Sequence, residues 1–152
     1  MTAEAARTVA AAFISSRLDY CNALLHGLPN TLLRKLQSVQ NATARLITDT
    51  RRCECDHITP VLRELHWLPI RERVKFKLAS LVHQSLSGQS PAYLADDCRL
   101  VLDSTCRSLR SADVPTCVVP RTYSSYDDRT FAAAGPWLWN SLPVQLCNPD
   151  IS

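Results

Sequence analysis

The 152-residue chain contains only three glycines and one methionine, and charged residues make up 20% of it. Three glycines leave little material for loops that cradle nucleotide phosphates, and neither a P-loop nor a G-x-S-x-G nucleophile elbow occurs. No apolar run is long enough to cross a bilayer, and no basic segment precedes the alanine-rich stretch at residues 3–14. These absences argue against a kinase, a hydrolase, a membrane partner and secretion. We expect an intracellular protein of the nucleus or cytoplasm.

Apolar residues recur at helical spacing through the first part of the chain. One helix is expected at about residues 3–26, where Gly27 ends it. A second helix is expected at about 31–48, with Asn30 as its N-cap. Each helix carries an apolar stripe, and the link between them is short. This pattern predicts an antiparallel helical hairpin.

Shorter helical signals follow the hairpin, and the periodicity then fades. Helices are expected at about 60–68, 70–86, 91–97 and 128–134. The segment after Cys98 holds only short β-prone pieces, such as Cys117-Val118-Val119. The predicted fold class is mainly α, with an irregular C-terminal tail that carries minor β-prone pieces. We expect a helical domain at 1–97 and a tryptophan-containing tail at 98–152 packed on it.

The net charge of +3 is unevenly distributed along the chain. Residues 34–77 hold ten Lys or Arg against five Asp or Glu, whereas residues 78–152 are slightly acidic. Lysines and arginines release counterions when they bind nucleic acid, so a basic middle is compatible with a phosphate-facing surface. From charge alone, a solvated helix face is the favoured interpretation, because a basic patch needs support from a motif before it indicates nucleic-acid binding.

The sequence Tyr93-Leu94-Ala95-Asp96-Asp97 resembles the aromatic-Ala-Asp-Asp motif that holds Mg²⁺ in reverse transcriptases. An extra leucine breaks the spacing of that motif, and the preceding Ser90-Pro91 favours a helix start over a strand. A two-metal site also needs a further carboxylate from an upstream strand, and no matching segment is found. We therefore predict exposed acids at a helix end, with no catalytic residue and no cofactor.

The segment Cys53-Glu54-Cys55-Asp56-His57 combines thiols with an imidazole, which are preferred zinc ligands. Structural zinc sites usually space their cysteines by two to four residues, and no second close pair completes the set here. A loop with free thiols is the favoured interpretation, so no metal site is predicted. Most of the seven cysteines are expected to be thiols packed as small apolar groups.

Two features of the C-terminal tail have alternative interpretations. Trp137 and Trp139 are able to stack on unpaired bases, but apolar neighbours favour their anchoring the tail on a helical core. Arg107, Arg110 and Arg121 lie in a segment of low periodicity and are candidates for phosphate contacts, but simple solvation is the favoured interpretation.

Three blocks of the chain carry a family resemblance. They are SRLDYCNALLHGLPNTLLRKLQSVQNATARLI (16–47), ITPVLRELHWLPIRERVKFKLASLVHQSLSGQSPAYL (58–94) and RSLRSADVPTCVVPRTYSSYDDRTFAAAGPWLWNSLP (107–143). In this order they resemble the region downstream of the polymerase active site in LINE-type (non-LTR, jockey-like) retrotransposon reverse transcriptases. The parent polyprotein of that family is an RNA-directed DNA polymerase.

The resemblance implies a mostly helical thumb and linker that grips a nucleic-acid backbone. Fingers, palm and endonuclease have no counterpart here, so we expect a truncated, non-catalytic element remnant. The residues that the resemblance places at an RNA or DNA backbone are Arg34, Lys35, Arg45, Arg71, Arg73, Lys75 and Lys77. The alternative is a helical protein-interaction module, or an inert remnant. Its apolar faces would then mediate self-association or contact with a reverse-transcriptase palm.

Overall fold

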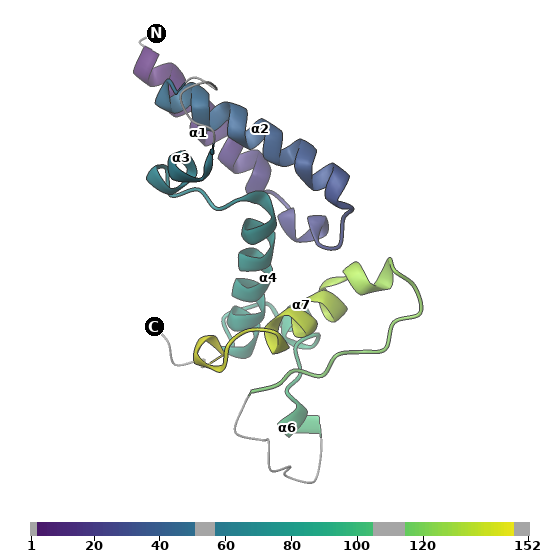
Figure 1. Cartoon of the computed structure of the whole chain (residues 1–152). Coiled ribbons are helices and arrows are strands. Elements are labelled where there is room, and N and C mark those ends of the chain that lie inside the picture. The colour runs from purple at the N-terminus through teal and green to yellow at the C-terminus, as the bar shows by residue number, and fades with distance from the viewer. Residues whose placement is uncertain (1–2, 51–56, 105–114, 148–152) are drawn as a thin grey trace. The chain divides into compact units, whose positions relative to one another are not determined.

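The computed structural model describes residues 3–50, 57–104 and 115–147, and these are mainly helical (Figure 1). Within those ranges no β-strand occurs, and an isolated antiparallel bridge joins Leu100 to Cys117. The predicted fold class is therefore confirmed. The chain forms two compact units, 1–74 and 75–152, with the division inside helix α4 (Ile70–Leu86). No helix in the described ranges is both long enough and apolar enough to span a membrane.

The first unit is built on an antiparallel hairpin of α1 (Ala3–Asp19) and α2 (Asn30–Thr48), which pack side by side (Figure 1). The prediction that the first helix continues to residue 26 is wrong. Cys21 adopts a left-handed conformation with φ of 50°, which interrupts the helical hydrogen bonds. The chain then forms a 3₁₀ turn, η1 (Asn22–Leu25), before the hairpin closes.

The start of α2 also differs from the prediction. Pro29 occupies the N-cap position, and Asn30 is the first helical residue. The side-chain oxygen of Asn30 caps no amide of its own helix, because it accepts a hydrogen bond from Nη2 of Arg71. The predicted N-cap is thus replaced by a contact between two helices.

Helix α3 (Thr59–Glu64) packs on α2 and is shorter than expected. It ends early because His66 has a positive φ of 54°, which breaks the helix ahead of Pro69. Helix α4 begins and ends at the residues predicted for it. The apolar core between α2 and α3 consists of Ala44, Val61 and Leu62, flanked by Ile58, Leu65 and Trp67.

The second unit comprises the rest of α4 and several short helices. These are α5 (Ala92–Ala95), α6 (Val101–Ser104), η2 (Asp127–Arg129), α7 (Phe131–Asn140) and η3 (Val144–Leu146). Its core consists of Val82, Cys98, Cys117, Trp139 and Cys147. The tail expected to be irregular thus contains a helix, α7, whose Trp139 belongs to this core.

Helix α7 is placed later than the predicted helix at 128–134 and runs through Gly135 and Pro136. The Gly-Pro pair resembles a stop signal, but burial of the following Leu138 and Trp139 keeps the chain helical. The glycine permits close packing on α4, since a Cβ at position 135 would lie 3.0 Å from Cγ2 of Val82.

Candidate phosphate-binding site

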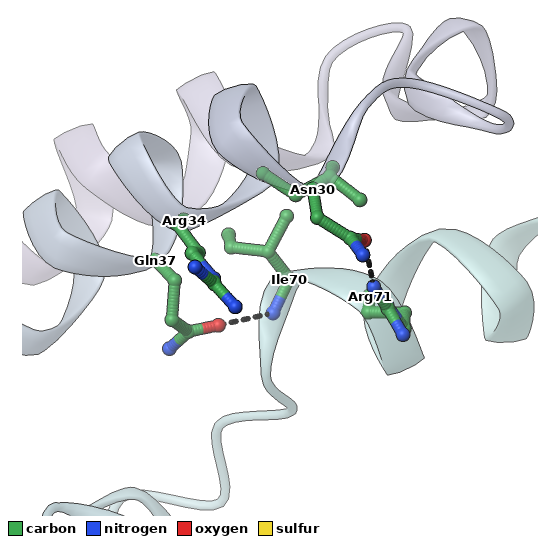
Figure 2. Close-up of a pocket in the computed structure, with 6 residues that line it drawn as sticks. Asn30, Arg34, Gln37, Ile70 and Arg71 are labelled. Carbon is green, nitrogen blue, oxygen red and sulfur yellow. Dashed lines mark hydrogen bonds between the residues drawn. The ribbon is translucent and has the colours of Figure 1, made fainter.

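The first unit contains a hollow of about 320 Å³ where α2 passes the first turn of α4 (Figure 2). Its lining residues are Asn30, Leu33, Arg34, Gln37, Ile70 and Arg71. Two of these are cationic, two are amides and two are aliphatic. No described residue that lines the hollow is acidic.

A chain of amides, of which Gln40 is buried and Gln37 and Asn41 are half-buried, holds the two sides of the hollow together. Gln37 Oε1 accepts a hydrogen bond from the backbone N–H of Ile70 at 2.8 Å. Gln37 Nε2 donates to Gln40 Oε1 at 2.9 Å and to Asn41 Oδ1 at 2.8 Å. Gln40 Nε2 donates in turn to the carbonyl of Leu68 at 2.9 Å. These bonds fix the start of α4 against α2.

Arg34 and Arg71 enter the hollow from different helices. Figure 2 shows them on either side of the Ile70 side chain, with Arg34 reaching from α2 toward the start of α4. Both residues are exposed, and Asn30 holds Nη2 of Arg71. No hydrogen bond or ion pair joins the Arg34 guanidinium to any other residue that the structure describes.

The other basic candidates differ in their environment. Arg73 is committed to an ion pair, with Nη1 2.6 Å from Oδ1 of Asp19 and a side chain only 13% exposed. Arg45 is half-buried in the last turns of α2, whereas Lys35 is exposed beside Arg34. Lys75, Lys77 and Arg121 are exposed and belong to the second unit, and Arg107 and Arg110 lie outside the described residues.

The acidic pair has the location expected of it. Asp96 is the C-cap of α5, Asp97 follows it, and both are exposed.

The two tryptophans of α7 differ in burial. Trp139 is 1% exposed and its Nε1 donates to the carbonyl of Pro115 at 2.9 Å, so its predicted anchoring role is confirmed. Trp137 is 58% exposed, so it does not share that role.

Most of the segment that was considered as a zinc site lies outside the described residues, including Cys53, Cys55 and Asp56. His57 is described and is exposed. Elsewhere in the described ranges, no three His, Cys, Asp or Glu side chains are arranged to hold a metal ion.

Cys98, Cys117 and Cys147 are buried thiols, as expected, and they share the second core, whereas Cys21 is exposed. Burial raises the pKa of the Cys117 thiol to about 12, helped by its two thiol neighbours. Burial likewise raises the pKa of Cys98 and of Cys147. Because the thiolate is the reactive form, these groups are chemically protected while the unit is folded.

This protection predicts a selective pattern of alkylation. Under native, mildly alkaline conditions, iodoacetamide should modify the exposed Cys21 and leave Cys98, Cys117 and Cys147 intact. In denaturant all four should react. Peptide mass spectrometry measures each site separately, and rapid native alkylation of Cys117 would contradict the buried cluster.

The hollow has the chemistry of an anion site. Guanidinium groups present forked N–H donors that match phosphate oxygens, and aliphatic walls accept the carbon face of a sugar.

No family model, curated protein or solved structure matches this chain.

Proposed function

We propose that this chain is a non-catalytic retroelement segment that holds the phosphate backbone of RNA or DNA without reading its sequence. The supporting observation is the hollow in the first unit, into which Arg34 and Arg71 project from two helices. The resemblance of residues 16–47, 58–94 and 107–143 to the region after the polymerase active site suggests the same ligand class.

Two physical arguments favour a backbone ligand. Each phosphate neutralised by a cation releases condensed counterions, and this release contributes favourably to the free energy of binding. The two arginines of the hollow are exposed, and no described residue that lines it is acidic, so both charges are available to a phosphate. Contacts to phosphate also carry no base information, which fits a grip that tolerates any sequence.

Fluorescence anisotropy with a labelled RNA–DNA hybrid duplex tests the proposal. We expect measurable binding at low salt that weakens steeply at moderate salt. The magnitude of the slope of log affinity against log salt should decrease by about one in Arg34→Ala, and by about one in the separate variant Arg71→Ala. Unrelated duplex sequences should bind equally well.

Arg63→Ala is the matched control, because it removes the same charge from an exposed position on α3 outside the hollow. It should change affinity much less than the hollow variants. Absence of binding by the unaltered protein at low salt would overturn the proposal.

A specific observation supports the alternative of a protein-interaction module. Leu32, Val39 and Leu46 are exposed on α2 at intervals of seven residues, as in a coiled-coil seam. Sedimentation velocity discriminates between the two functions. Self-association that persists at high salt and ignores added duplex would favour the interaction module.

A further inference from the structure

We infer that the hollow is a discrete site for one phosphorylated sugar unit of a nucleic-acid strand. The phosphate lies between the guanidinium groups of Arg34 and Arg71, and the sugar lies against the half-buried Leu33. This inference rests on the proposed function and deepens it, because it replaces a diffuse basic surface with a shaped site.

The size and lining of the hollow support a ligand larger than a bare phosphate. Its volume of about 320 Å³ falls at the lower end of the range usual for small-molecule sites, about 300–1,000 Å³. Leu33 is half-buried and offers an accessible apolar surface beside Arg34, whereas Ile70 is only 2% exposed and contributes to the wall behind it. Such a surface suits the carbon face of a ribose or deoxyribose.

The site is preorganised by the amides behind it. Gln37 lies one helical turn after Arg34, and it binds the backbone N–H of Ile70, the residue before Arg71. The separation between the backbones of the two arginines is therefore set before a ligand arrives. Preorganisation of this kind raises affinity, since less ordering is required on binding.

Asn30 acts as a positioning residue for Arg71. Its side-chain oxygen accepts a hydrogen bond from Nη2 of Arg71, and the other guanidinium N–H groups remain available as donors. As a neutral amide, Asn30 orients the guanidinium without cancelling its charge. An aspartate in its place would compete with the phosphate for Arg71.

A double-mutant cycle distinguishes a shared site from independent charges. In low-salt anisotropy titrations with the labelled hybrid duplex, Arg34→Ala and Arg71→Ala should each weaken binding about tenfold. The double variant should also weaken binding about tenfold, not about a hundredfold, because removing either arginine alone already abolishes the site that both arginines form. Lys35→Ala, next to Arg34 on α2, should cost only about twofold to threefold. Thermal melts followed by circular dichroism verify that each variant folds.

Variants of Asn30 and small competitors complete the test. Asn30→Asp should weaken binding at least as much as Arg71→Ala, and Asn30→Ala should weaken it several-fold, both with unchanged melting temperatures. A purely structural Asn30 would leave the affinity of the folded variants unchanged. Adenosine monophosphate should displace the duplex at lower concentration than inorganic phosphate, since only the nucleotide carries a sugar.

The outcomes separate this inference from the function on which it rests. If the unaltered protein fails to bind the duplex at low salt, both fail. If it binds, but Arg34→Ala and Arg71→Ala match Lys35→Ala and are additive, the discrete site is overturned and backbone binding stands. Equal competition by phosphate and nucleotide would overturn the sugar subsite.

Discussion

Replacing Trp139 with alanine should lower the free energy of unfolding of the second unit by about 3–5 kcal/mol. The indole is 1% exposed and belongs to the core formed with Val82, Cys98, Cys117 and Cys147. Its loss leaves a large cavity and removes the hydrogen bond to the Pro115 carbonyl. Since small domains are stable by only about 5–15 kcal/mol, much of the folded population would disappear on mild heating.

Trp137→Ala provides the matched control. Trp137 lies on the same helix but is 58% exposed, so its replacement should cost no more than about 1 kcal/mol. Urea denaturation followed by far-UV circular dichroism measures both variants without depending on tryptophan emission. Equal destabilisation by the two substitutions would show that the buried core is wrongly assigned.

Replacing Gln40 with alanine should destabilise the first unit by about 2–4 kcal/mol. Gln40 is fully buried, donates to the Leu68 carbonyl and accepts from Gln37. The shorter side chain leaves a cavity and deprives both partners of a hydrogen bond. The start of α4 should then loosen, and the duplex affinity that we propose for the hollow should fall with it.

Amide hydrogen exchange reports this loosening directly. The Ile70 N–H is bonded to Gln37, so its exchange should accelerate in Gln40→Ala. Ser38→Ala, an exposed position on the same helix, should leave that rate unchanged. Unaltered Ile70 exchange in a folded Gln40→Ala variant would contradict the role given to the amide chain.

The fold was predictable where apolar periodicity and clear boundary residues coincide. Helix α4 has both, with Pro69 before it and Gly88, at a φ of 69°, beyond its end. The starts of α1 and α3 were predicted, but their ends were not, because Cys21 and His66 adopt left-handed conformations that no glycine signals. Helix α7 was misplaced because tertiary burial outweighs the local preference of Gly-Pro to end a helix.

The candidate site was predictable only in part. Arg34 and Arg71 were two of ten basic candidates, and their sequence separation gave no sign that they share a hollow. The amides behind them were missed, although Gln37, Gln40 and Asn41 are spaced to meet on one face of α2. Three amide side chains at i, i+3 and i+4, on a helix with apolar positions beside them, are the sequence pattern that indicates such a network.

The close approach of α7 to α4 constrains how related sequences can drift. Any side chain at position 135 meets Cγ2 of Val82 at 3.0 Å, so a methyl group gained there must be offset by volume lost at position 82. Related sequences that keep this packing should therefore pair a glycine at position 135 with a valine at position 82, or an alanine with a smaller partner. That correlated exchange would serve as a fingerprint of shared ancestry where overall similarity has eroded.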